Sequence, residues 1–284
     1  MYNRKVLIGN WNEERELEKV NIADYIKKRD NKELIIQKIR TLFHNMCREI
    51  QLCRTGNYIE FGNRIQIFAP DVQSFQENGE NKNFGIIVSV TIPRNAIGKI
   101  ERFTDQMPVV CAAKTEPCTR NTFTIQSTNC NNKNGEYLLF NQNFLLKLTD
   151  SVEEDLYLRS VTPLVDDTRG PREHNRVLLS NIKDCYCLWK VIICDKNMRF
   201  ETEGSPVPVS KRVVITHVMT GKCLAVEGLN WKSSIFGIEC EISVHTYRDV
   251  NKRETSECHW MFVTEKLPRG IDEKCSLAEQ LEKC

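Results

Sequence analysis

The sequence of 284 residues lacks the features that mark several classes of protein. No apolar run approaches the roughly 20 residues that a membrane-spanning helix requires. The first segment, MYNRKVLIGNWNEE, has no apolar core of the signal-peptide kind, and no Asn-x-Ser/Thr glycosylation site occurs. From these absences we expect an intracellular protein that does not bind membranes.

Motifs of the common catalytic and cofactor-binding sites are also missing. The sequence contains no Walker A loop, Rossmann glycine pattern, HExxH, Gly-x-Ser-x-Gly or EF-hand loop. Its five histidines are scattered along the chain. We therefore predict no enzymatic activity, no cofactor, and no catalytic, cofactor-binding or metal-binding residue.

Cysteine, by contrast, is abundant, with thirteen residues. An odd count in an intracellular protein argues against a disulfide framework, and no Cys-x2-4-Cys pair has a matching second pair for zinc. Alternation in CYCLWKVIIC predicts a strand with Cys185, Cys187 and Trp189 on one face, packed in a core. We expect no structural zinc and no obligatory disulfide.

Residues 1–54 are predicted to form a helical arm. Asn10 and Glu13 fit the capping pair of a first helix, and Asn31 fits the cap of a second. Apolar residues of the second helix recur at three- and four-residue spacing: Ile35, Ile39, Leu42, Phe43, Met46 and Ile50. This stripe fits either packing on the protein's own core or binding to a partner.

Positive charge is concentrated in the same arm. Residues 1–54 hold 12 Lys and Arg and 8 Asp and Glu, a net charge of +4, whereas the whole chain is +2 (40 minus 38). The remainder is therefore −2 (28 minus 30). Such an excess favours an acidic partner at low salt but is too small to indicate nucleic acid.

The rest of the chain reads as short strands separated by turns. Eleven β-rich segments are found at residues 63–70, 83–93, 120–128, 143–149, 155–161, 175–180, 187–194, 212–218, 223–226, 239–247 and 259–265. Roughly twelve short strands without an intervening helix indicate a mainly β protein. We predict a β domain over residues 55–265 and a short tail over 266–284.

A faint internal repeat favours a β-trefoil, a closed barrel of six hairpins. The segments NTFTI, CLWKV and HWMFV each end a block of about four strands and place Phe123, Trp189 and Trp260 in equivalent core positions. An irregular β-sandwich is the alternative. The Gln-x-Trp repeat of sugar-binding trefoils is missing, which disfavours a lectin.

The segment VVITHVMTGKCLAVEG (213–228) places a histidine and a cysteine on either side of a Thr-Gly pair. Gly221 can adopt positive φ, so the pair predicts the turn of a hairpin. No acidic residue lies nearby in sequence to orient a Cys-His or Ser-His pair at His217 and Cys223. The segment therefore indicates a hairpin rather than a reactive site.

Four segments carry a resemblance to a known family: LIGNWNEE (7–14), EGSPVPVSKRVVITH (203–217), VHTYRD (244–249) and CHWMFVT (258–264). In order and spacing they resemble the family of cilia- and flagella-associated protein 161, from about Val6 to Glu265. Between residues 70 and 185 the resemblance is confined to RNTF (120–123).

The resemblance implies a microtubule inner protein of ciliary and flagellar doublets, which binds tubulin and neighbouring inner proteins in the A-tubule lumen and is not a catalyst. Because GNWNEE belongs to it, we predict interaction residues Trp11, Asn12, Glu13 and Arg15. The internal repeat and the hairpin turn give the predicted structural core residues Phe123, Trp189, Trp260 and Gly221. A cytosolic ligand-binding, lectin-like trefoil is the alternative. An enzyme with a cysteine nucleophile is the third hypothesis.

Overall fold

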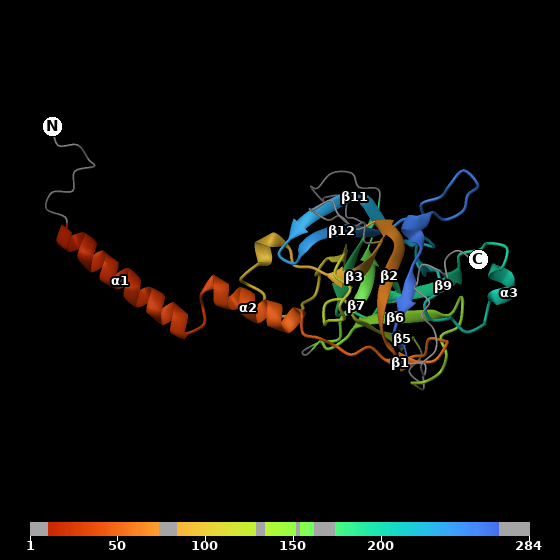
Figure 1. The fold of residues 1–284 in the computed structure, drawn as a ribbon, viewed down its shortest axis with the longest axis horizontal. Helices are drawn as coiled ribbons and strands as arrows, with labels where there is room; N and C mark the ends of the chain where they lie inside the picture. Colours follow the sequence, from red (N-terminus) through yellow and green to blue (C-terminus); the bar gives the residue numbers. More distant parts are fainter. Residues whose placement is uncertain (1–10, 74–83, 129–133, 152–153, 162–173, 267–284) are drawn as a thin grey trace, which may run out of the picture.

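The computed structural model describes residues 11–73, 84–128, 134–151, 154–161 and 174–266. In Figure 1 a body of strands carries two helices on one side, and the outer helix projects away from it. The outer helix is α1 (Trp11–Asp30) and the inner one is α2 (Ile35–Met46). The prediction of a mainly β protein with a helical N-terminal part is confirmed. Within the described ranges no helix is both long and apolar enough to cross a membrane.

Twelve strands form one large sheet that divides in chain order into three groups of four. The first group is β2 (Arg64–Gln73), β3 (Phe84–Val90), β4 (Val109–Ala112) and β5 (Phe123–Ser127). The second is β6 (Asn143–Leu148), β7 (Tyr157–Val161), β8 (Asn175–Ser180) and β9 (Trp189–Ile193). The third is β10 (Val213–His217), β11 (Leu224–Ser234), β12 (Gly237–Val244) and β13 (Met261–Val263).

Short elements connect and flank these groups. They are β1 (Arg54–Thr55), which pairs in parallel with β14 (Glu265–Lys266), the helix α3 (Arg199–Thr202), and the 3-10 turns η1 (Arg94–Ala96), η2 (Cys185–Cys187) and η3 (Ser256–Cys258). The prediction that Cys185 and Cys187 belong to a strand is therefore wrong. Those residues form η2, where the Asp184 carboxylate accepts the Tyr186 backbone N–H, and β9 begins at Trp189.

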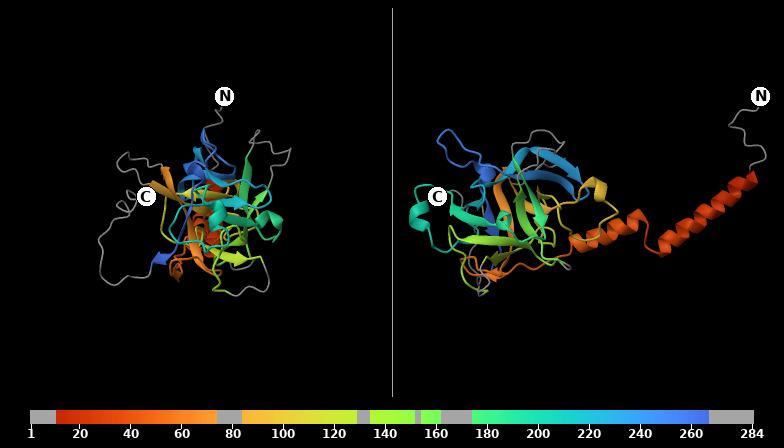
Figure 2. Two further views of the ribbon diagram at one scale, coloured as in Figure 1. Left: turned by 90° about the vertical axis from the view of Figure 1, so that its right-hand side faces the viewer. Right: turned by 180° about the vertical axis from the view of Figure 1, so that it is seen from behind.

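The first and last strands of the three groups pair in a closed circuit. The antiparallel pairs are β2–β5, β5–β6, β6–β9, β9–β10 and β13–β2, and a bridge between Val213 and Trp260 joins β10 to the start of β13. The middle strands form the hairpins β3–β4, β7–β8 and β11–β12, and β12 also pairs with β4 and β8. The two views in Figure 2 show these strands surrounding a common interior.

One apolar core fills this interior. Phe123, Trp189 and Trp260 are fully buried in it, together with aliphatic residues from all three groups. The indole N–H groups of the two tryptophans donate to the Leu158 and Leu224 carbonyls at 2.9 and 2.8 Å, so neither is left unpaired in the core. Leu158 and Leu224 both belong to the second strand of their group, which makes the two environments equivalent.

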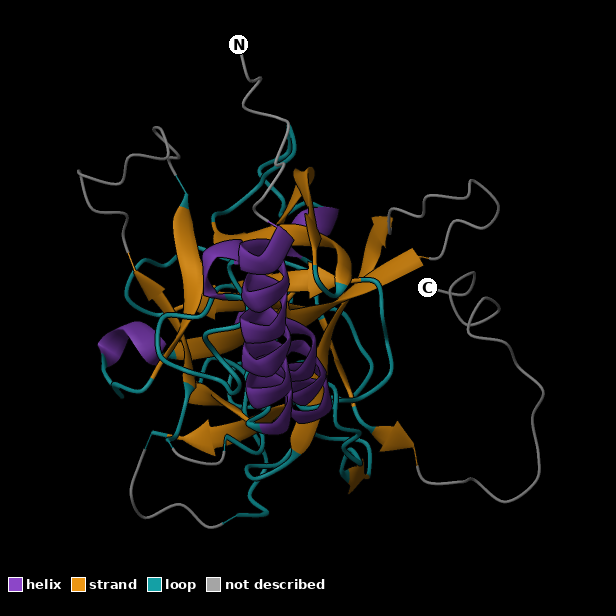
Figure 3. Ribbon diagram, turned by 90° about the vertical axis from the view of Figure 1, so that its left-hand side faces the viewer, coloured by secondary structure: helices purple, strands orange, loops and turns teal. Residues whose placement is uncertain are grey.

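The two helices differ in how they relate to this body. Leu42 and Met46 of α2 are 1% and 0% exposed and belong to the main core, whereas α1 buries no residue. Figure 3 views the molecule from this side, with the helices in front of the strands. Part of the predicted stripe thus packs on the protein's own core, while Ile35 at its start is 67% exposed. The boundary between arm and β domain at residue 54 remains a prediction.

The predicted cap of the second helix at Asn31 is wrong. Lys32 adopts a positive φ of 60°, which turns the chain between the helices, and α2 begins only at Ile35. The Gln37 side chain accepts the Leu34 backbone N–H at 3.3 Å. The N-terminus of α2 is therefore capped by a side chain of its own first turn, and Asn31 lies too far upstream to cap it.

Candidate interaction surface

The predicted interaction residues lie together in the first turns of α1. Trp11, Asn12, Glu13 and Arg15 are all exposed. The guanidinium carbon of Arg15 is 5.9 Å from the centre of the Trp11 ring, within the range of a cation–π contact. Asn10, predicted to cap this helix with Glu13, lies outside the described residues. The structure thus brings Trp11 and Arg15 together on one face of the first turns, whereas Glu13, two residues from Trp11, lies on the other side of the helix.

Charges at both ends of α1 favour the helix. Glu13 and Glu14 lie in the first turn and Lys27, Lys28 and Arg29 in the last, as the helix dipole prefers. The ion pairs Glu16–Lys19 and Asp24–Lys28 span one turn each, at 2.7 Å. Such pairs contribute only about 0.2–0.5 kcal/mol each. Since isolated helices are marginally stable in water, α1 would gain from a partner that covers it.

Apolar residues occupy two sides of α1. Trp11, Ile22 and Tyr25 are 59%, 51% and 55% exposed, and their spacing of 11 and 3 residues places them on one face. Leu17 and Val20 lie on the opposite face and are 62% and 63% exposed. The face with Trp11 carries the two aromatic rings, the side chains that most often anchor protein interfaces.

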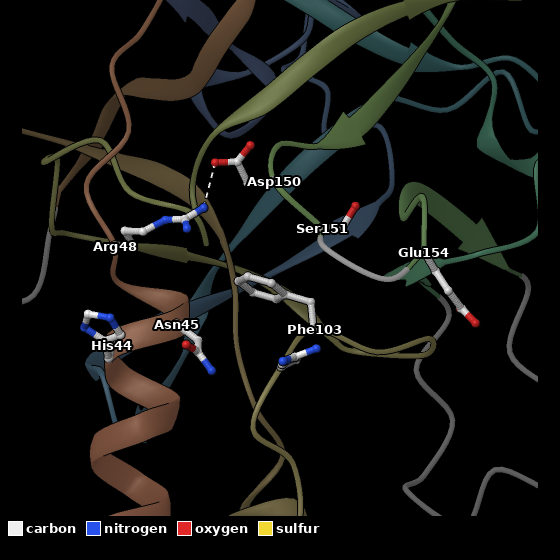
Figure 4. A pocket seen from close by; sticks show the side chains of 8 residues that line it. His44, Asn45, Arg48, Phe103, Asp150, Ser151 and Glu154 are labelled. Carbon is white, nitrogen blue, oxygen red and sulfur yellow. Dashed lines mark hydrogen bonds and ion pairs between the residues drawn. The ribbon is translucent and has the colours of Figure 1, made fainter.

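The end of α2 is joined to the body by polar contacts around a small hollow (Figure 4). Arg48 pairs with Asp150 at 2.8 Å, and the Asn45 amide donates to the Glu101 carbonyl at 2.9 Å. The hollow has a volume of about 140 Å³. It is smaller than the roughly 300–1,000 Å³ of small-molecule sites, so this place is a joint between helix and body rather than a ligand site.

A buried ion pair lies beneath α2. Arg120 and Glu239 are 6% and 3% exposed, and the Arg120 guanidinium donates to the Glu239 carboxylate. Thr91 donates to the same carboxylate at 2.6 Å. The Arg120 guanidinium also lies 4.0 Å from the centre of the Phe236 ring, which contacts Phe43 of α2 edge-on at 5.1 Å. This chain of contacts connects α2 with the first and third strand groups.

Sequence reasoning did not single out this pair. Arg120 stands in the RNTF segment of the resemblance, but charge alone gave no sign of its burial, because Glu239 is 119 residues away along the chain. Only the pairing of β12 with β4 and β3 with β4 brings the two regions together.

A larger cleft of about 650 Å³ lies among the three hairpins and is bordered by Glu227. The Glu227 carboxylate accepts hydrogen bonds from Ser243 and from the Tyr247 hydroxyl, the latter at 2.7 Å, and contacts His174 Nδ1 at 2.7 Å. Burial favours its neutral form, but these hydrogen bonds outweigh burial and lower the Glu227 pKa. Glu227 is therefore a carboxylate held in place by its neighbours.

The hairpin around Gly221 has the predicted turn. Gly221 has a φ of +65° and its N–H donates to the His217 carbonyl at 2.9 Å. The fully buried His217 ring makes bonds of 3.0 Å between Nδ1 and the Thr220 hydroxyl and 2.9 Å between Nε2 and the Tyr186 carbonyl. Burial lowers the His217 pKa, so the neutral ring is favoured. Nδ1 therefore holds the turn, and Nε2 joins the end of β10 to η2.

The described cysteines are free thiols, and within the described ranges no group of three or more His, Cys, Asp or Glu side chains could hold a metal ion. Burial raises the pKa of most of the thiols whose pKa is shifted. The pKa values of Cys187 and Cys194, for example, are raised to about 11. Raised pKa values reduce the thiolate fraction and hence the nucleophilicity of these cysteines.

Comparison with known proteins gives one consistent result. The family described as "Cilia- and flagella-associated protein 161-like domain" matches residues 38–175 and 165–265. Proteins named cilia- and flagella-associated protein 161 from Bos taurus, Mus musculus and Danio rerio are 31%, 30% and 28% identical, each over 93% of this chain and 82%, 88% and 88% of their own length. The match extends through residues 70–185, which corrects the narrower resemblance found from the quoted segments alone.

Solved structures give a weaker likeness. A protein of unknown function from Caenorhabditis elegans aligns over 73% of this chain and 97% of its own, with a TM-score of 0.48 and 14% identity. The SDF2-like protein from Arabidopsis thaliana aligns over 75% and 99%, with a TM-score of 0.46 and the same identity. Likeness at this level supports no conclusion about function.

Proposed function

The chain belongs to the family of the cilia- and flagella-associated protein 161-like domain, and on that premise we propose that it is a structural microtubule inner protein. It binds tubulin in the A-tubule lumen of ciliary and flagellar doublets, contacts neighbouring inner proteins there, and stabilises the axoneme for motility. The role needs no catalysis and no cofactor. The family and the relatives' names support association with cilia and flagella, and α1 supports binding to a partner.

The observation that carries this proposal is the complete exposure of α1. Twenty residues form a helix that buries none of its side chains, although Trp11, Ile22 and Tyr25 share a face. Burying apolar area stabilises by roughly 25 cal/mol per Å², so a partner that covered this face would stabilise both the helix and the complex. In a microtubule the same contact recurs along the lattice, and modest contacts add up through multivalency.

The β domain would supply a rigid block between neighbours, and we propose that its fold is a β-trefoil. The closed circuit of six strands and the three hairpins formed by the middle strands support this assignment. The equivalent bonds of Trp189 and Trp260 to second-strand carbonyls support it as well. An irregular sandwich would leave the edges of both its sheets open instead of returning β13 to β2.

The binding role of α1 is tested with full-length protein in ciliated cells that lack the endogenous copy. Trp11→Ala combined with Ile22→Ala removes apolar area from the aromatic face, and Leu17→Ala combined with Val20→Ala is the matched control on the opposite face. We expect the first pair to lower incorporation into detergent-extracted axonemes about tenfold, a loss of roughly 1.4 kcal/mol, and the control to incorporate like wild type.

The result that contradicts the proposal is equal incorporation of both variants at wild-type level. That outcome would move the binding surface to the β domain. Because α1 buries no residue, neither pair of substitutions should change the melting temperature of the body, and thermal unfolding of each variant checks this.

A further inference from the structure

Two cysteines of the third strand group lie side by side in a small core of their own. Cys223 directly precedes β11 and Cys258 ends η3, and they are 3% and 0% exposed. Both pack with Val214 and Ala225 in a cluster separate from the main core. Residues 35 positions apart in sequence thus share one site.

The backbone around His245 positions both sulfur atoms. The His245 N–H donates to the Cys223 carbonyl at 2.9 Å, and the Cys258 Sγ lies 3.9 Å from the His245 carbonyl oxygen. The Thr246 hydroxyl accepts the Cys223 backbone N–H at 3.1 Å. Cys223 and Cys258 thus pack in one four-residue cluster, and each is held by residues 245–247.

The same contacts make the pair chemically unequal. Interaction with the neighbouring Cys258 thiol lowers the Cys223 pKa despite its burial. Interaction with Cys223 and burial together raise the Cys258 pKa. A thiolate next to a protonated thiol is the arrangement of a nucleophilic and a resolving cysteine.

The two cysteines lie at the ends of secondary-structure elements, Cys223 directly before β11 and Cys258 at the end of η3. Cys223 is two residues from the exposed Gly221 turn, and Cys258 is two residues from the exposed Ser256. Strand and turn ends open locally more easily than the centre of a sheet. Because the two thiols are 3% and 0% exposed, a small oxidant reaches their sulfur atoms when these ends open locally.

We propose that Cys223 and Cys258 form a dithiol site that hydrogen peroxide oxidises reversibly to a disulfide. The Cys223 thiolate attacks one peroxide oxygen, the O–O bond breaks, and the leaving hydroxide takes a proton to become water. The resulting Cys223 sulfenic acid is attacked by the Cys258 sulfur, which forms the S–S bond and releases a second water. Two thiols and one peroxide thus give one disulfide and two waters.

The site is tested by treating reduced full-length protein with a small molar excess of hydrogen peroxide at neutral pH. Catalase ends the reaction, N-ethylmaleimide blocks the remaining thiols under denaturing conditions, and non-reducing peptide mass spectrometry identifies linked cysteines. We expect a Cys223–Cys258 cross-link that forms before any other and that dithiothreitol reverses. The melting temperature should rise by roughly 5 °C on oxidation, because the disulfide restricts the unfolded chain.

Single substitutions distinguish this pair from general oxidation. Cys223→Ser and Cys258→Ser should each abolish the cross-link and the rise in melting temperature, whereas Cys240→Ser should retain both, since Cys240 is buried elsewhere and burial raises its pKa to about 12. Recovery of Cys223 and Cys258 as maleimide adducts while the exposed Cys185 is oxidised would overturn the proposal. The wild-type measurement alone decides this if a variant does not fold.

Discussion

Replacing Trp260 by Ala should destabilise the protein by about 3–5 kcal/mol, the usual cost of removing a core aromatic side chain. Trp260 is fully buried in the main core, its backbone bridges to Val213, and its indole donates to the Leu224 carbonyl at 2.8 Å. Trp260→Phe keeps a ring in the core but removes the donor and part of the buried volume, because phenyl is smaller than indole. The unpaired Leu224 carbonyl should then cost about 1–3 kcal/mol, with the volume lost from the core in addition.

The assay is urea unfolding monitored by circular dichroism, with thermal unfolding as a second measurement. Trp189→Phe is the matched variant, since its indole bonds the Leu158 carbonyl at 2.9 Å in the second strand group. The two Phe variants should lose similar stability. At about 2 °C per kcal/mol, the melting temperature of Trp260→Ala should be roughly 6–10 °C below that of wild type. If Trp260→Phe unfolds like wild type while Trp189→Phe is strongly destabilised, the equivalence of the groups is refuted.

Three further changes test other parts of the structure. Gly221→Val should cost about 1–2 kcal/mol in chemical unfolding because φ is +65°, while Gly221→Asn should cost less; equal stability of all three proteins would contradict this. Glu239→Gln should cost about 3–5 kcal/mol by leaving Arg120 charged and buried, and adding Arg120→Met should recover part of it; no recovery in the double-mutant cycle would count against the pair. Burial lowers the His217 pKa, so the stability that the neutral ring contributes is complete above about pH 6.5 and is lost as the pH falls through the folded pKa. If the melting temperature of His217→Asn depends on pH as that of wild type does, this reasoning is refuted.

Much of the fold was predictable from local pattern. Segments rich in β-forming residues located every strand of the twelve-stranded sheet except β4. Val109–Ala112 has only four residues, so it is too short to stand out as an apolar run, whereas the longer β10 was found although it too is buried throughout. The far half of β11 was missed for a different reason, since its register shifts between Val226 and Trp231 and its residues beyond Val226 are exposed or half-buried.

Contacts between distant segments could not be predicted. Nothing near Arg120 in the sequence points to Glu239, and nothing near Cys223 points to Cys258, because each pair forms only when separate hairpins come together. The turn at Gly221, by contrast, is fixed by residues within a few positions of one another, so sequence reasoning located it. Local chemistry thus predicted turns and strands, and tertiary pairing determined the sites.

The exposure of α1 was also beyond sequence reasoning. Both helices carry apolar or aromatic residues at helical spacing, and this pattern does not tell which helix is buried. In the structure Leu42 of α2 is 1% exposed, whereas Tyr25 of α1 is 55% exposed. The difference arises because only α2 meets the Phe236 region of the body. It identifies α1 as the helix that has surface left for a partner.

Cryo-electron microscopy of doublet microtubules from cells that express the full-length protein tests the central claim most directly. The proposal predicts density for the β body inside the A-tubule, repeating along the axoneme, with α1 lying against a neighbouring protein and its Trp11 face covered. Density confined to the outside of the doublet, or a body in the lumen whose α1 remains free of any contact, would contradict it.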